Sequence, residues 1–219
     1  MDFEAIVSYL PLYKEAFFLT IKIGWMGIGL SFLIGIVAAF ILYFKIPIIS
    51  AIVKAYVELF RNTPLLVQLF FIYFGLPKLG FMVSAQTCGF VGLGLLGGSY
   101  MTEAIRSGLS AVPVSQIEGA EALGFSKSQI FTSIILPQAF TISITALIAN
   151  VIFLLKETSV FSAISLMDLM FTAKDLIGLY YKTTECLFLL VIFYIIMLLP
   201  VSLLGTLVEK KIRFGIFGD

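Results

Sequence analysis

Apolar residues in this chain gather into runs that are long enough to form membrane-spanning helices. The runs lie at residues 17–44, 64–77, 89–112, 139–155 and 186–207. A helix rises about 1.5 Å per residue, so the longest run crosses a hydrocarbon core of about 30 Å with some tilt, and the shorter runs need neighbouring helices. The pattern predicts an all-α integral membrane protein with about five transmembrane helices.

The segments between these runs are mixed in polarity and are expected to lie near the membrane surface. Residues 1–16 predict a short amphipathic segment on the bilayer that does not span it. Residues 45–63 carry Lys54, Glu58 and Arg61 along one helical face and predict an interfacial connection. Residues 160–183 predict a broken or re-entrant segment and an amphipathic piece outside the membrane.

The longest polar interval, Glu118–Pro137, predicts two short helices joined by a turn. Small and charged residues occur at helical spacing, and one narrow, nearly flat face holds Ile117, Ala120, Glu121 and Gly124. Gly124 is expected to close the first helix, because glycine tolerates a left-handed conformation. Ser126 is a candidate N-cap for a second helix from Lys127, which Pro137 is expected to interrupt.

This interval resembles the EAA loop of permease subunits in bacterial ATP-binding-cassette importers. Glu118-Gly119-Ala120 is followed after three residues by Gly124 and, nine residues later, by Ile134-x-Leu136-Pro137. The one departure is Gly119, where the family has alanine. The resemblance implies a coupling helix, in a loop at about 113–133, that docks into a groove on a cytoplasmic ATPase. The residues assigned to coupling are Glu118, Gly119, Ala120, Glu121, Gly124, Phe125, Leu136 and Pro137. From the residues alone, the alternative is a solvated connector between two spans.

Two further segments resemble the polar amino acid branch of these permeases, the histidine, glutamine and arginine permease family. Residues 58–75 read ELFRNTPLLVQLFFIYFG, and residues 98–108 read GSYMTEAIRSG, which is similar to the family pattern GAYxxExxRGG. The resemblance implies that residues 1–219 form one transmembrane permease domain with the type I importer fold. Glu103 and Arg106, three positions apart on a helix, predict a structural ion pair.

A fourth element, Lys156-Glu157-Thr158-Ser159, resembles the family's K-D/E-T-S segment at the outer end of the fourth span. Adjacent charges there are costly next to lipid unless they face protein or water. We therefore expect these four residues to contribute to a translocation pathway for a zwitterionic amino acid. The alternative is that Lys156 anchors the helix end in the interface while Glu157 begins a cap.

Composition excludes several other classes of protein. With 60% hydrophobic residues, 12% charged residues and a mean hydropathy of +1.10, the chain requires lipid as its solvent. A net charge of +1 offers no basic surface for nucleic acid, and the absence of histidine removes histidine-based metal sites and general-base catalysis. Cys88 and Cys186 are isolated in apolar surroundings and are expected to act as small hydrophobes, so no metal site is expected. Asp2 and Glu4 are atypical of a cleavable signal peptide.

The chain has no P-loop lysine motif, so a partner must supply the energy for transport. The resemblance implies a non-enzymatic permease subunit that binds no cofactor, an ATP-hydrolysing cassette subunit, and an extracytoplasmic solute-binding protein. A second permease copy, identical or not, is expected because glycine-rich helix faces, such as that of Gly24, Gly27, Gly29 and Gly35, need covering. The alternative function is an autonomous secondary transporter or channel for small polar solutes.

Charge asymmetry predicts the orientation in a bacterial cytoplasmic membrane. Lys210, Lys211 and Arg213 follow the last span directly, which is where the positive-inside rule has most weight. Of the fourteen basic residues, eight fall inside if the N-terminus is outside and the C-terminus cytoplasmic, with Arg61 among them. This orientation places the loop at 113–133 in the cytoplasm.

Overall fold

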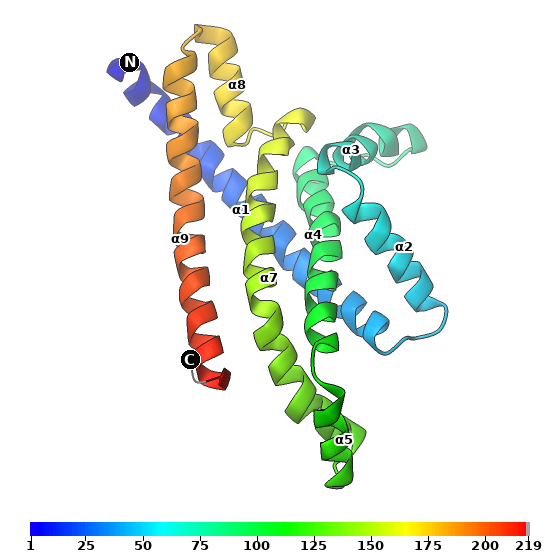
Figure 1. Cartoon of the computed structure of the whole chain (residues 1–219). Helices are drawn as coiled ribbons and strands as arrows, with labels where there is room; N and C mark the ends of the chain where they lie inside the picture. Colours follow the sequence, from blue (N-terminus) through cyan, green and yellow to red (C-terminus); the bar gives the residue numbers. More distant parts are fainter. Residues whose placement is uncertain (218–219) are drawn as a thin grey trace.

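The computed structural model describes residues 1–217, with side chains described for residues 1–212, and this part of the chain contains helices and no strand (Figure 1). The main helices are α1 (Phe3–Tyr43), α2 (Ile49–Arg61), α3 (Leu65–Phe70), α4 (Ala85–Ser110), α5 (Val114–Ala122), α6 (Lys127–Ile130), α7 (Leu136–Glu157), α8 (Leu169–Tyr180) and α9 (Thr183–Phe217). Short π-helical turns at Phe71–Gly75 and Phe131–Ile135 and 3₁₀ turns at Leu76–Leu79 and Thr158–Ile164 extend α3 and α7. The predicted all-α class is confirmed. The side chain of Arg213 lies outside the described residues.

The long helices run alternately up and down the bundle (Figure 1). α1 descends, the α2–α3 pair returns, and α4, α7 and α9 follow in alternating directions. The N-terminus and α8 lie at one end of the bundle, and α5 lies at the other, toward which α9 runs. The predicted spans therefore correspond to α1, the α2–α3 pair, α4, α7 and α9.

Three helical stretches among the described residues are long and apolar enough to cross a membrane by length and composition. They are Phe3–Tyr43, Lys127–Ile164 and Thr183–Ile212, and a fourth is formed if Ile49–Arg61 and Leu65–Leu79, bent by 106°, count as one span. α4 falls outside this set although it was predicted to span. α1, α2 and α7 pack around α4, so its glycine, serine and threonine residues face protein, and the helix does not need the composition that lipid contact demands.

The first span is longer than predicted. Residues 3–43 form one continuous helix that includes Pro11, so the prediction of a separate surface segment at residues 1–16 was wrong. At about 1.5 Å per residue, α1 is about 60 Å long, twice a hydrocarbon core, and it crosses the bundle obliquely (Figure 1). Its N-terminal part is held by tertiary contacts: the Tyr13 hydroxyl donates to the Cys186 carbonyl at 2.7 Å, and Lys182 pairs with Asp2 at 3.1 Å.

The segment predicted as an interfacial connection, residues 45–63, also differs. It contains α2, which runs from the turn after α1 along α4 (Figure 1). The chain then bends by 106° into α3, which runs outward from α4. Gln68 fixes this corner, because its side-chain amide donates to the carbonyls of Phe60 at 3.0 Å and Thr63 at 2.9 Å. The Arg61 guanidinium lies over Tyr100 and 3.8 Å from Glu103, within the length of α4 and not beyond its α5 end.

Close contact between α1 and α4 forms the centre of the main core. A Cβ atom built on Gly35 would lie 3.2 Å from the α4 backbone at Met101 and Thr102, and the Ser31 hydroxyl lies 3.3 Å from the Leu93 carbonyl of α4. Gly27 likewise faces Leu93 of α4, whereas Gly29 has nothing within 4 Å among the described residues. The glycine faces are thus covered mainly by helices of the same chain, so this reason for expecting a second copy was wrong.

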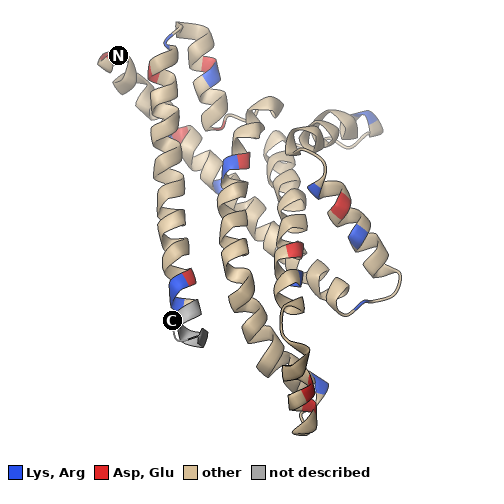
Figure 2. Ribbon diagram, in the orientation of Figure 1, with Lys and Arg blue, Asp and Glu red and all other residues tan. Residues whose placement is uncertain are grey.

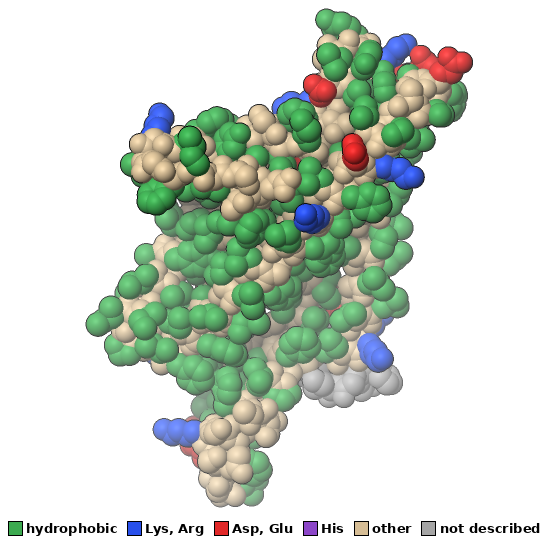
Figure 3. Space-filling view, turned by 180° about the vertical axis from the view of Figure 1, so that it is seen from behind, with side chains coloured by type: hydrophobic (Ala, Val, Ile, Leu, Met, Phe, Trp, Pro, Cys, Tyr) green, Lys and Arg blue, Asp and Glu red, His purple; other side chains and the backbone are tan. Residues whose placement is uncertain are grey.

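Charge is distributed unevenly over these helices (Figure 2). α7 and α9 are uncharged along their middle stretches, whereas α2 and α4 carry charged residues partway along. Hydrophobic side chains cover most of the middle of the face seen from behind (Figure 3). Cys88 and Cys186 are buried free thiols within the described chain, which confirms their interpretation as small hydrophobes.

The α1–α4 contact generates a prediction. Gly35→Ala places a methyl group against α4 backbone that cannot move aside, and we expect it to cost about 1–3 kcal/mol of stability. Gly29→Ala on the same helix is the matched control, since its methyl group meets open space and alanine favours the helix. Thermal unfolding of the detergent-solubilised protein measures both, and an unchanged melting temperature for Gly35→Ala would contradict the packing described.

Candidate functional site

The loop between α4 and α7 has the local structure that its sequence predicts. Gly124 has a φ of +82°, its N–H donates to the Glu121 carbonyl at 2.9 Å, and the Phe125 N–H reaches back to the Ala120 carbonyl at 3.1 Å. These two bonds form a Schellman motif that closes α5. Ser126 caps α6, and its side chain and that of Gln129 form a reciprocal capping box. The predicted helix end and N-cap are confirmed.

The side chains of α5 divide between an inner and an outer face. Ala120 is only 5% exposed and belongs to a small core with Leu109, Ile130 and Ile135, against which Ile117 also packs. Of the four residues expected on one narrow, nearly flat face, Ala120 and Ile117 therefore pack inward, whereas Glu121 and Gly124 are exposed. Exposed residues around the end of α5 include Glu118, Gly119, Glu121, Ala122, Leu123, Gly124 and Phe125. Leu123, 80% exposed at the tip, was not among the predicted coupling residues.

Pro137 does not interrupt the helix that follows. Helical structure continues from Lys127 to Ile164, and Pro137 stands in the first turn of α7, directly after the π-helical turn Phe131–Ile135. Proline lacks an N–H group, and its ring needs space in the preceding turn. Here the preceding turn is π-helical, which is wider than an α-helical turn. Leu136 and Pro137 are both exposed.

The structure separates Lys156 and Glu157. Lys156 is exposed toward a groove between α7 and α9, whereas Glu157 lines a cavity on the side of α2, α3 and α4. Thr158 is buried, and Ser159 is partly buried. Glu157 occupies the N-cap position of the 3₁₀ turn Thr158–Ile164, but its side chain makes no capping hydrogen bond in the described structure. The two charges do not act on one cavity.

Glu157 instead faces Arg61 across a cavity of about 350 Å³, here called the α2–α7 cleft. The cleft is lined by Arg61, Asn62, Thr63, Pro64, Leu65, Leu66, Leu96, Tyr100, Phe153, Glu157 and Val160. Arg61 lies over the Tyr100 ring, with its guanidinium carbon 5.4 Å from the ring centroid, in a cation–π arrangement. The cleft thus presents one cation and one carboxylate beside aromatic and aliphatic surface.

Arg61 also belongs to a charge network with α4. Arg106 donates from Nε and Nη2 to the two Glu103 oxygens at 3.0 and 2.7 Å, which confirms the predicted ion pair. The Nη1 atom of Arg61 is 3.8 Å from Glu103 Oε2, a longer and weaker contact. The two short contacts from Arg106 make it the principal partner of Glu103. Arg61 retains donors for a further anion.

Asp168, between the fourth and last spans, is a buried polar residue that the sequence analysis did not single out. Its carboxyl group caps α8 by accepting from the N–H groups of Phe171 at 3.0 Å and Met170 at 3.3 Å. Burial raises the pKa of Asp168 to about 7, against the opposing effect of these hydrogen bonds. The group is therefore partly protonated near neutral pH.

A family model described as "binding-protein-dependent transport system inner membrane component" matches residues 31–214. The chain belongs to this family. Among curated relatives in this transport family, the arginine transport system permease protein ArtQ of Bacillus subtilis is 31% identical over 97% of this chain and 98% of its own length. The probable glutamine permease protein GlnP of the same organism is 33% identical over 81% and 83%.

Solved structures of such transporters have the same fold. A chain from a crystal structure of an amino acid ABC transporter with histidines superposes with a TM-score of 0.90, at 32% identity over 96% of this chain and 99% of that one. A chain of the MetNI methionine ABC transporter, in an inward-facing conformation, gives a TM-score of 0.77 at 21% identity over 94% and 98%, which is a likeness of fold. The predicted type I importer fold is confirmed.

Proposed function

We propose that this chain is the permease subunit of an ATP-driven amino acid importer in a bacterial cytoplasmic membrane. The observation that carries the proposal is the α5 loop, which projects from one end of the bundle with an exposed tip. The names of the relatives, an arginine and a glutamine permease, support an amino acid as the substrate. The subunit itself is non-catalytic and binds no cofactor, and a separate cassette subunit hydrolyses ATP.

In this proposal, α5 docks on the ATPase through its exposed outer face, with Glu118, Gly119, Glu121, Gly124 and Phe125 at or beside the contact. Ala120 positions the helix from the inside, because it is packed against the core beneath α5. Leu136 and Pro137 sit where α6 joins α7 and connect the loop to the fourth span. A movement of the ATPase groove is thereby passed to α7, one wall of the α2–α7 cleft.

The orientation follows from the same assignment. The α5 end is cytoplasmic, the C-terminus lies on that side, and the N-terminus and α8 are outside, where a solute-binding protein delivers the substrate. A second permease copy completes the pathway, and the long exposed apolar faces of α1 and α9 leave room for it as well as for lipid.

The α2–α7 cleft receives the substrate. An amino acid carries a carboxylate that Arg61 can bind and an ammonium group that Glu157 can accept, with Thr158 and Ser159 directly after Glu157. A zwitterion neutralises both protein charges at once, which offsets their desolvation. For Lys156 the geometry favours the alternative of an anchor at the end of α7.

The coupling assignment is tested at Gly124. Gly124→Val forces a β-branched residue into the left-handed region at a cost of about 1–2 kcal/mol and displaces the loop tip. We expect uptake to fall about tenfold or more in vesicles that contain the whole transporter, with membrane insertion retained. Gly124→Asn is the matched control, because asparagine tolerates this conformation. Normal ATP-driven uptake by Gly124→Val would show that α5 does not couple.

The cleft is tested at Glu157. Glu157→Gln keeps the shape of the side chain and removes its charge, so we expect the rate of uptake to fall about 10- to 100-fold, the effect of losing one charge-assisted hydrogen bond. Assembly with the ATPase should be unchanged. Glu4→Gln, at an exposed carboxylate outside the cleft, serves as the control. Uptake by Glu157→Gln equal to that of the unmodified protein would remove Glu157 from the pathway.

The same vesicles distinguish the importer from the alternative, an autonomous secondary transporter or channel. If uptake of the amino acid proceeds without the ATPase subunit or without ATP, the importer assignment is wrong even where the Glu157 result holds.

A further inference from the structure

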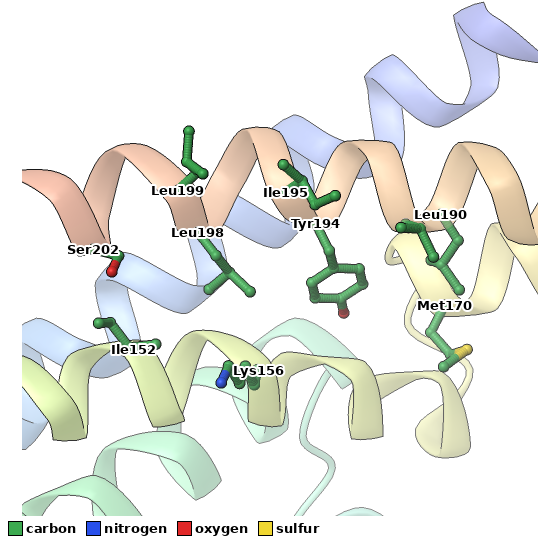
Figure 4. Close-up of a pocket in the computed structure, with 10 residues that line it drawn as sticks. Ile152, Lys156, Met170, Leu190, Tyr194, Ile195, Leu198, Leu199 and Ser202 are labelled. Atoms are coloured by element: carbon green, nitrogen blue, oxygen red, sulfur yellow. The ribbon is translucent and has the colours of Figure 1, made fainter.

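A second cavity, on the opposite side of α7 from the α2–α7 cleft, has the chemistry of a lipid site. This cavity, here called the α7–α9 groove, has a volume of about 520 Å³ (Figure 4). It is lined by Ile152, Lys156, Met170, Leu190, Val191, Tyr194, Ile195, Leu198, Leu199 and Ser202. All but three of these side chains are apolar, and Lys156 is the one charged residue among them.

Lys156 supplies the one positive charge of the groove lining. It stands next to the last residue of α7, where the uncharged stretch of that helix ends toward the α8 side. Figure 4 shows Lys156 on α7, the wall of the groove that faces Tyr194 and Leu198 of α9. Lys156 is exposed and forms no ion pair with any side chain in residues 1–212.

Tyr194 lies at the same level. Its ring lines the groove, whereas its hydroxyl oxygen is buried beside Thr158 and Ser159. The groove therefore offers a cation at its outer end and hydrocarbon contact below it.

We propose that the α7–α9 groove binds an anionic phospholipid of the outer leaflet. The phosphate group lies at the Lys156 ammonium, and one acyl chain follows the apolar wall of Ile152, Leu198 and Leu199. A helix from a second copy is the competing occupant. Its apolar side chains would strip water from Lys156 without neutralising it, whereas a phosphate supplies the opposite charge.

This inference does not depend on the amino acid pathway, because Glu157 and the α2–α7 cleft lie on the other side of α7. The lipid would fill the space between α7 and α9 at the level of Met170, where α8 begins. It would thereby hold the last helix at a fixed spacing from the helix that connects to α5.

The test is native mass spectrometry of the purified transporter complex, exchanged into phosphatidylglycerol or phosphatidylcholine. A lysine at an anionic headgroup contributes about 1 kcal/mol, so Lys156→Met should lower the affinity for phosphatidylglycerol about fivefold and leave phosphatidylcholine unaffected. Lys22→Met, at an exposed lysine of α1 that does not line the groove, is the matched control and should retain binding. Equal phosphatidylglycerol binding by Lys156→Met and Lys22→Met would overturn the proposal.

A photoreactive residue in place of Ile195 identifies the occupant directly. Ile195 is 52% exposed and lies on the groove wall (Figure 4). In bilayers that contain phosphatidylglycerol, we expect the cross-linked product to carry the mass of one phospholipid, and less of it in the Lys156→Met background. A product that joins two permease chains in place of lipid would show that a second copy fills the groove.

Discussion

The close approach of α1 and α4 is the contact on which the other features depend. Gly35 lets the two backbones meet at Met101, and Ser31 and Gly97 pack together further along the same seam. Because α1 crosses obliquely, it holds α4 in the middle of the bundle, and α2 and α7 then pack on the remaining sides of α4. A glycine-rich helix can occupy this central position because protein, not lipid, surrounds it.

The central helix α4 carries part of the charge network and also leads into the α5 loop. Its residues Glu103 and Arg106 form this network with Arg61 of α2, and an unpaired member would be costly in lipid. With Glu157 the four charges sum to zero, so the α2–α7 cleft suits a ligand that carries both signs. Beyond Arg106, α4 ends at Ser110 and leads into α5, whose inner face rests on the end of α4 and on the start of the fourth span.

Local signals in the sequence predicted local structure well. Gly124, Ser126 and Gln129 define the loop through backbone geometry and caps that need no tertiary contact, so the helix end could be predicted there. Periodicity also grouped Ala120 with its neighbours, but it cannot show which face of a helix the rest of the fold covers. Pro137 was misread because a π-helical turn in the preceding residues has no sequence signature.

Other features required the tertiary structure. The polar residues near the N-terminus suggested a surface segment, and only the contacts of Tyr13 and Asp2 with distant residues show why the helix continues. Arg61 and Glu157 are far apart in the chain, and only the folded structure shows that they line the same cleft. The separation of Lys156 from Glu157 was predictable, however, because consecutive helical residues point about 100° apart.

The central claim, that the exposed tip of α5 meets the ATPase, is tested most directly by site-specific cross-linking at Leu123. A Leu123→Cys protein with Cys88 and Cys186 replaced by alanine would carry one thiol, at a position 80% exposed. In the assembled transporter, a short thiol-to-amine cross-linker should join this cysteine to the ATPase subunit, with a yield that changes when ATP binds. Capture of no ATPase by Leu123→Cys in a transporter that takes up its substrate would contradict the account.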